Sequence, residues 1–301
     1  ITTNVYTQLL ELTASFNADN SPGRSTRLAI REKNSGKFVA FIKLGSPVIS
    51  MRPRHEYFKV KKVDLKTLNQ HCLNGFNIVP AQPFGFNYLG GKLLAAICCS
   101  HDVRRFLNKK YSGPFCMFET TSLYGNIKGG SMYDGMRPFL RYKGNTDSKF
   151  FLTFAEDMYH EMKKWFESRN GNEPLVHKDA SSRKLKTQTK MISIISNSLK
   201  QYNLDAYNNF IKFRKDTENV TTQKRFYMSS YGYENSREYI LRETDKLKKG
   251  QVWDRHELEN IVKWWKNKAG KRYAALKADG RLRSKLEVWR KDNIDTIDII
   301  R

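Results

Sequence analysis

The sequence predicts an α+β protein, with a mixed sheet and flanking helices followed by a helical, basic region that ends in a three-helix bundle. Three observations predict this class. Strand-like and helix-like segments alternate over residues 1 to about 150. From Arg183 to Lys249 the chain is helical in pattern, polar and basic. The last fifty residues place apolar side chains at helical spacing on either side of a glycine turn.

These features divide the chain into three expected regions. An α/β domain should cover residues 1–175, a helical basic linker region residues 176–249, and a helical bundle residues 250–301. The polar, loop-like stretches Asn170–Pro174 and Asp179–Ser182 mark the first boundary. The length of the chain also favours more than one domain.

The chain is strongly basic. It carries 54 Lys and Arg against 30 Asp and Glu, a formal net charge of +24 on 301 residues. Because the excess is spread over both halves and exceeds what solubility requires, we expect a polyanionic partner, double-stranded DNA. A basic membrane-surface protein is the competing interpretation, but the charge is not accompanied by a long amphipathic helix with a clean apolar face.

Neither a membrane nor a metal is expected as a partner. The longest apolar run, Leu93–Cys99, is too short to span a bilayer, and no signal-peptide pattern opens the chain. Cys72, Cys98, Cys99 and Cys116 fit neither a disulfide framework nor a zinc site. We therefore expect buried, free cysteines and a reduced, cytoplasmic setting.

The first half of the chain supplies the expected sheet. Asn34-Ser-Gly marks a hairpin turn between the strands Arg27–Glu32 and Lys37–Leu44. A short apolar strand, Phe76–Val79, ends at Pro80 and is followed by a loop. The later segments are a long helix Leu89–Lys110, the strand Pro114–Thr120, a short helical piece Ser131–Met136, the strand Pro138–Tyr142 and an amphipathic helix Phe150–Arg169.

The final bundle is expected to begin at a capping box. Asp254 precedes Glu257 by three residues. Apolar residues then recur at helical spacing, at Leu258, Ile261, Val262 and Trp265. A second helix should cover Lys271–Asp279, and Gly280 suits the turn after it. Helix, helix, glycine turn and basic helix is the order of a helix-turn-helix, in which the last helix reads DNA.

The third helix of this bundle should start near Gly280 and present a basic face. The bundle resembles the Myb-like and invertase-type DNA-binding domains over about one sixth of the chain. An ordinary helical hairpin with a solvated basic face is the alternative. On the first interpretation the DNA contacts come from Arg281, Arg283, Ser284, Lys285, Arg290 and Lys291.

The order of strand, glycine-containing loop, long helix, strand and tyrosine-bearing short helix resembles the core of the GNAT acyltransferase superfamily. In that family a Gln/Arg-x-x-Gly-x-Gly/Ala loop and the next helix N-terminus hold the pyrophosphate of acetyl-CoA. Gln82-Pro-Phe-Gly85-Phe-Asn87 occupies this place, with Asn87 at the last small position and Pro83 lacking an N–H. The resemblance implies acetyl-CoA or another acyl donor, held by Gln82, Gly85, Asn87 and a second turn, Gly90-Gly91-Lys92.

The run from His71 to Lys143 resembles the DruA-like family of the Druantia anti-phage system. The resemblance rests on the strand ending Ile78-Val-Pro, the long helix, the strand Met117-Phe-Glu-Thr-Thr and the stretch Gly129-Gly-Ser131-Met-Tyr133. It covers about a quarter of the chain. The same region is similar to the phage Mom protein, which modifies adenine in DNA through a GNAT-like fold.

Two ionisable residues are candidates for acid–base chemistry. Glu119 ends an apolar strand, where a carboxylate beside a cleft can act as a general base. Tyr133 matches the place of the tyrosine general acid in GNAT enzymes, and Ser131 and Tyr124 should line the same loop. We expect Glu119 and Tyr133 to flank one cleft. The alternatives are that Glu119 caps or pairs with a basic neighbour and that Tyr133 is an ordinary half-buried tyrosine.

These resemblances imply a phage- or defence-related, DNA-associated protein with a GNAT-like core. As an enzyme it would transfer a small acyl-type group to a DNA base. The alternative is a non-catalytic DNA-binding or anti-defence factor whose GNAT-like core has lost its cofactor. An acetyltransferase that modifies tRNA or the ribosome would also suit the charge.

Overall fold

A computed structural model describes residues 2–14, 23–122, 131–146, 152–180, 183–221, 225–286 and 288. The chain forms two compact units. Unit 1 joins Ile1–Asp147 to Lys224–Arg301, and unit 2 is the inserted segment Ser148–Gln223. This division differs from the expected regions, because residue 175 lies inside unit 2 and residue 250 lies inside unit 1.

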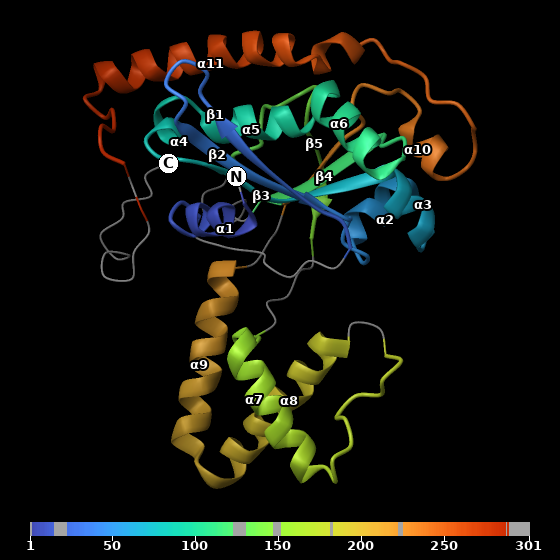
Figure 1. The fold of residues 1–301 in the computed structure, drawn as a ribbon, viewed down its shortest axis with the longest axis vertical. Coiled ribbons are helices and arrows are strands. Elements are labelled where there is room, and N and C mark those ends of the chain that lie inside the picture. The colour runs from blue at the N-terminus through green and yellow to red at the C-terminus, as the bar shows by residue number, and fades with distance from the viewer. Residues whose placement is uncertain are drawn as a thin grey trace. The chain divides into compact units, whose positions relative to one another are not determined.

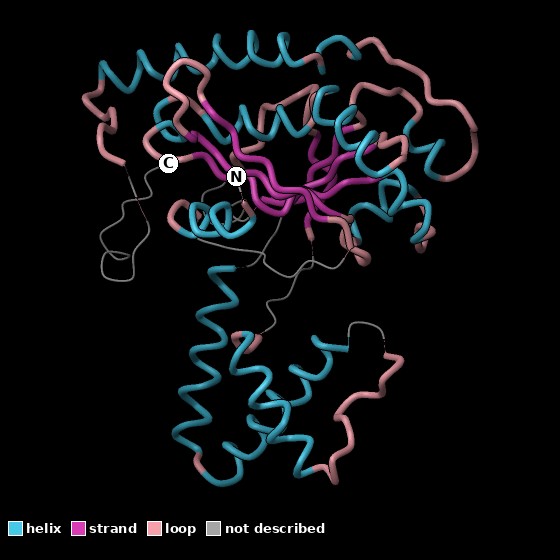
Figure 2. Tube along the Cα trace, viewed as in Figure 1, coloured by secondary structure: helices cyan, strands magenta, loops and turns pink. Residues whose placement is uncertain are grey.

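Unit 1 is built on one mixed sheet of six strands in the order β1-β2-β3-β4-β6-β5. Neighbouring strands are antiparallel except β3 and β4, which run parallel (Figures 1 and 2). The mixed α+β class is therefore confirmed. The strands are β1 (Ser25–Arg31), β2 (Phe38–Gly45), β3 (Cys72–Pro80), β4 (Met117–Ser122), β5 (Arg141–Asn145) and β6 (Arg225–Ser229).

Helices cover both faces of this sheet (Figure 1). Alternate strand residues point to opposite faces, so Leu73, Phe118 and Tyr227 enter one core, whereas Met117 and Met228 enter the other. On the first face lie α4 (Phe84–Asn87), α5 (Gly90–Cys98) and α6 (His101–Tyr111). On the second lie α1 (Thr3–Glu11), α2 (Arg52–Phe58), α3 (Leu65–His71) and α10 (Ser236–Ile240).

The local elements of the first half follow the sequence in part, with corrections. The strand expected over Pro138–Tyr142 begins only at Arg141. The hairpin of β1 and β2 and the strands β3 and β4 are confirmed. The long helix expected over Leu89–Lys110 is two helices, because the Ser100 hydroxyl accepts from Val103 N at 3.2 Å and starts α6. Ser131–Met136 forms turns rather than a helix.

Strand β6 was not expected, because residues 183–249 were predicted to be helical. It lies between β4 and β5, so both of its edges are paired. Phe226 and Met228 enter one core and Tyr227 the other. A five-residue strand that is apolar on both faces shows no alternation, and its partners lie far away in the chain.

The end of the chain is the largest departure from expectation. After a 3₁₀ turn, Trp253–His256, a single helix α11 spans Leu258–Ala278, where a break between two helices was expected. Its N-cap is Glu257, and Asp254 makes no capping box with it. Gly280 adopts the left-handed conformation expected of a turn. Arg281–Leu286 is not helical, so the described residues do not form the third helix of a helix-turn-helix.

Residues 279–283 are held against α4 instead. The Asn87 side chain donates to Arg283 O at 2.7 Å and accepts from Arg283 N at 3.1 Å. The guanidinium groups of Arg272 and Arg283 lie over the Phe86 ring, at 4.7 and 4.3 Å from its centroid. Asn87 thus satisfies both backbone groups of Arg283 outside a helix. Arg290 and Lys291 lie outside the described residues.

Unit 2 contains three helices within its described residues: α7 (Glu156–Arg169), α8 (Arg183–Tyr202) and α9 (Leu204–Thr221). Its core is small and consists of Tyr159, Phe166, Leu175 and Met191. The Gln188 side chain accepts from Phe154 N at 2.7 Å and so fixes the chain before α7. Unit 2 carries no residue predicted to take part in a site.

A buried ion pair ties the start of α2 to the centre of the sheet. Arg54 Nη1 donates to both carboxylate oxygens of Glu119, at 2.7 and 3.0 Å, and both side chains are fully buried. Arg54 Nη2 also donates to Val48 O and Ile49 O. Burial raises the pKa of Glu119, whereas Arg54 and the Val48 N–H lower it.

Two buried histidines fasten the 3₁₀ turn before α11 to α6. His256 Nδ1 lies 2.8 Å from Cys99 O, and His101 Nε2 lies 3.0 Å from Trp253 O. Each ring must carry its proton on the nitrogen that faces a carbonyl. Burial lowers the pKa of His256 to about 4, and nearby His101, Arg104 and Arg141 act in the same direction.

Removing either member of the Arg54–Glu119 pair should strongly destabilise unit 1. Arg54→Met or Glu119→Gln leaves an uncompensated buried group, at a cost of about 3–5 kcal/mol in urea unfolding. The double variant should cost much less than the sum of the two. If the Glu119→Gln protein is as stable as the parent, Glu119 is not a structural residue. That result would leave a role as a catalytic base open for Glu119.

Unit 1 should lose stability in acid through His256. Between pH 6.5 and about 4 the unfolded imidazole binds a proton that the folded one does not, so stability falls as pH falls. The total loss is about 3 kcal/mol, at roughly 1.4 kcal/mol per pH unit. His256→Asn keeps a donor for Cys99 O and should flatten this part of the pH profile. Equal slopes for both proteins would contradict the assignment.

Candidate functional site

The candidate site lies where β3 and β4 separate. They pair in parallel only from Cys72 to Gly75 and from Met117 to Thr120. Beyond Gly75, β3 follows β2 as far as Pro80, whereas β4 follows β6. The chain crosses over between them through α4, α5 and α6. Ligands of open sheets with parallel strands commonly bind beyond the carboxyl ends of such a pair.

A hydrogen-bonded cluster around Asp134 lies at the β4–β6 side of this opening. The Tyr227 hydroxyl donates to Asp134 Oδ1 at 2.8 Å, and Arg225 Nη1 donates to Oδ2 at 2.8 Å. Ser131 N donates to Oδ2 at 3.0 Å. Burial raises the pKa of Asp134, but these three donors outweigh it and hold the pKa below its usual value. Asp134 is therefore a fixed anion that positions its neighbours.

Lys92 connects this cluster to the first turn of α5. Its Nζ donates to Asp134 O at 2.7 Å. Burial and the neighbouring Lys268 of α11 lower the pKa of Lys92. Gly91 faces the Met132 thioether so closely that a Cβ there would collide with it. The turn of Gly90, Gly91 and Lys92 therefore contacts the Ser131–Asp134 turn, so residues from both turns can belong to one site.

Ser131 and Tyr133 belong to this cluster, but the Tyr133 side chain is turned inward. The Ser131 hydroxyl accepts from Tyr133 N at 3.2 Å. Tyr133 is only 5 % exposed, and its hydroxyl bonds to Thr120 of β4. Burial raises its pKa far above the ordinary value. In this arrangement the Tyr133 hydroxyl is a core hydrogen-bonding group. Tyr124 lies outside the described residues.

Glu119 and Tyr133 do not flank one cleft. Glu119 points to the face of α2 with Met117, whereas Tyr133 packs on the opposite face with Phe118. The expectation of a shared cleft is therefore wrong, because neighbouring residues of a strand alternate between faces. The ion pair with Arg54 agrees with the alternative that Glu119 pairs with a basic neighbour.

The loop expected to hold a pyrophosphate is engaged with itself. Gly85 N donates to Ala81 O, Asn87 N to Pro83 O and Tyr88 N to Phe84 O, at 2.9 to 3.1 Å. The Gln82 side chain accepts from Phe86 N at 2.9 Å. A Cβ on Gly85 would meet Pro80 and Gln82, so this glycine serves packing within the loop. As folded, the loop does not offer these N–H groups to a phosphate, and it does not fit the pyrophosphate of acetyl-CoA.

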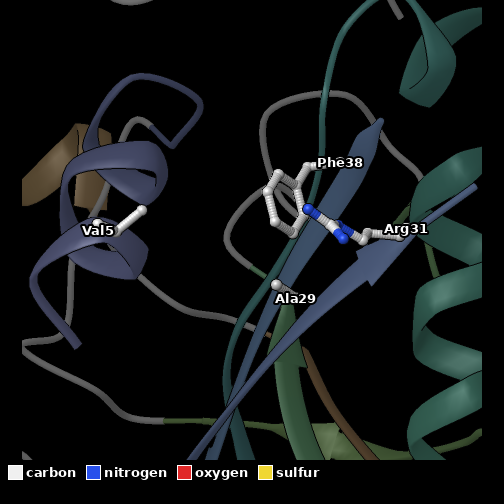
Figure 3. Close-up of a pocket in the computed structure, with 4 residues that line it drawn as sticks. All are labelled: Val5, Ala29, Arg31 and Phe38. Carbon is white, nitrogen blue, oxygen red and sulfur yellow. The ribbon is translucent and has the colours of Figure 1, made fainter. Parts of the chain in front are cut away.

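Two hollows on the described part of unit 1 contain no residue predicted for a site. One, of about 460 Å³, lies between α1 and the β1–β2 hairpin, where Arg31 stacks on Phe38 (Figure 3). The other, of about 440 Å³, is lined by Ser50, Arg52, His55, Glu56, Lys59, Val60 and Lys61.

The described ranges contain neither a metal-binding cluster nor a membrane-spanning helix. There, no group of three or more His, Cys, Asp and Glu could hold a metal ion. None of the helices in those ranges is both long and apolar enough to cross a bilayer. The four cysteines are free and buried, as expected.

Asp134, Arg225 and Tyr227 were not among the predicted site residues. The spacing of Ser131 and Asp134 could have indicated Asp134, because Asp and Ser side chains commonly close turns of this length. Arg225 and Tyr227 carry no such signal, because their strand was not predicted. Their position opposite Asp134 depends on the pairing of β6 with β4 and β5.

The predicted DNA contacts at the end of the chain are only partly described. Arg281 pairs with Asp279 at 2.6 Å, and Arg283 is held over Phe86. Ser284 and Lys285 are exposed. None of the four lies on a helix, so they do not form the expected recognition surface.

Comparison with known proteins identifies the family. No curated protein and no solved structure matches the chain. A family model described as Druantia protein DruA matches residues 4–217, which is more than half of the chain. The match covers β1 to β4, the Ser131–Asp134 turn and most of unit 2. The chain therefore belongs to the DruA family.

Proposed function

We propose that this protein serves anti-phage defence by binding DNA through unit 1. Membership of the DruA family supports the defence role. The charge distribution carries the proposal for DNA. Unit 2 has 13 basic and 9 acidic residues, so unit 1 holds 41 and 21 and has a net charge of +20. A polyanion is the partner that such a charge attracts.

The GNAT-like kinship of the core is part of this proposal. It is supported by the strand order, by the single parallel pair among the described strands, and by the helices that cross over between β3 and β4. The separation of β3 and β4 beyond Gly75 and Thr120 agrees with it. The kinship concerns the fold and does not by itself imply acyl transfer.

Transfer of an acyl-type group to a DNA base is the second candidate. It is favoured by the meeting of the Gly90–Lys92 turn with Ser131 and Asp134 at the carboxyl ends of β3 and β4. Two observations favour the non-catalytic alternative instead. Backbone N–H groups of the Gln82–Asn87 loop are hydrogen-bonded within the loop. The Asn87 side chain is hydrogen-bonded to the backbone of Arg283. We therefore propose DNA binding without acyl-CoA held at this loop.

Duplex binding by the full chain should weaken steeply with salt. Each phosphate contact adds about 0.9 to the slope of log affinity against log salt. We expect a slope of at least about 4, measured by fluorescence anisotropy with a labelled 20-bp duplex between 50 and 300 mM salt. No binding at low salt, or a slope of log affinity against log salt near zero, would contradict the proposed function.

Acetyl-CoA and CoA should leave the melting temperature unchanged, because the loop N–H groups are already engaged. A ligand present at a hundredfold excess over its dissociation constant would stabilise the protein by about 2.7 kcal/mol, which differential scanning fluorimetry detects. A dose-dependent rise would favour the transferase.

A further inference from the structure

The outer face of α11 is a strongly basic surface of unit 1. This 21-residue helix has six basic residues and one acidic residue, Glu259. Its inner face, with Ile261, Ala269 and Leu276, is buried against unit 1. Figure 1 shows α11 running along the outer side of α5, away from the sheet. Lys263, Lys266, Lys268, Lys271 and Lys277 are all exposed.

Among the described residues, the carboxylates at the two ends of α11 are paired elsewhere and do not neutralise this face. Glu257 at the helix start pairs with Arg105 at 3.2 Å, and Asp279 after its end pairs with Arg281 at 2.6 Å. Lys263 and Lys277 are about 21 Å apart along the axis, at 1.5 Å per residue. Lys263, Lys266, Lys271 and Lys277 therefore form a basic row along one side of a packed helix, opposite its buried residues.

The centre of the same face carries only small side chains. Gly270 and Ala274 are exposed between the lysines, and a Cβ on Gly270 would meet nothing within 4 Å. A glycine inside a helix costs about 1 kcal/mol relative to alanine. No contact within the described chain offsets this cost. A centre of small side chains flanked by lysines lets a phosphate backbone approach the helix closely while ammonium groups reach it from both sides.

The chemistry of this face selects among polyanions. A bilayer surface would need large apolar side chains to insert, and Asn267, Gly270 and Ala274 supply none. A-form RNA has a major groove too deep and narrow for a helix, whereas the major groove of B-DNA admits one. The basic row thus fits the backbones that border a DNA groove.

We propose that the outer face of α11 is the surface through which this protein docks on the backbone of duplex DNA. This inference deepens the proposed function and rests on it. It replaces the expected recognition helix near Gly280 with an element about twenty residues earlier in the chain. The contacts are to phosphates, so binding is largely independent of sequence.

The test compares two full-chain variants that lose the same charge. One carries Lys→Gln at Lys263, Lys266, Lys271 and Lys277. The matched control carries Lys→Gln at four exposed lysines on the opposite face of the sheet: Lys59, Lys61, Lys62 and Lys66. We expect the α11 variant to bind a 20-bp duplex about 10- to 1,000-fold more weakly at 100 mM salt, with a salt slope lower by about 3 to 4. The control should keep most of its affinity and slope.

A second variant tests the close approach. Gly270→Glu adds bulk and a negative charge in open space, so it should keep the melting temperature and weaken duplex binding at least tenfold. Gly270→Ala, its control, should keep the affinity within about twofold and raise the helix stability.

The outcomes separate this inference from the proposed function. If the parent does not bind duplex DNA, the proposed function fails. If the parent binds but both lysine variants lose affinity equally, the assignment of the α11 surface is wrong and DNA binding stands. The same holds if only the control variant loses affinity. Tighter binding of the parent to a duplex RNA of the same length would also overturn the assignment to DNA.

Discussion

The parallel pairing of β3 and β4 is the constraint on which the rest of unit 1 depends. A parallel pair cannot be closed by a short turn, so the chain must cross over between the strands, and α4, α5 and α6 do so. The crossover brings the first turn of α5 to the carboxyl ends of both strands. Because β4 also pairs with β6, an element from a distant part of the chain sets Arg225 and Tyr227 beside Asp134.

The part of the fold that the sequence predicts is the part fixed by local chemistry. Asn34-Ser-Gly closes the β1–β2 hairpin, and short apolar runs ending at turn residues give β3 and β4. Strand β6 and the single helix α11 depend on distant partners instead. The break expected near Gly270 does not occur, since the inner face of α11 stays buried from Ile261 to Leu276 and outweighs the weak propensity of one glycine.

The same distinction explains the candidate site. Gly91 and Lys92 were predicted from a glycine turn and Ser131 from its place in the loop of Tyr133, and the structure brings the three together. Glu119 was assigned from its residue type and its place at the end of an apolar strand. Only the pairing of β4 shows that Thr120 faces Tyr133 while Glu119 faces Arg54. Pattern matching likewise found the Gln82–Asn87 loop, but its hydrogen bonds depend on how the loop closes on Pro80 and Arg283.

The proposed DNA surface and the candidate site share structural elements. Helix α11 packs on α4 and α5, and Lys268 of α11 is close enough to Lys92 to lower its pKa. A helix with its side chains is about 10–12 Å across. DNA docked on the outer face of α11 would therefore lie roughly one helix diameter from the Asp134 cluster. A phosphate near Lys268 would offset its repulsion of Lys92, the lysine that bridges α5 to the Ser131–Asp134 turn.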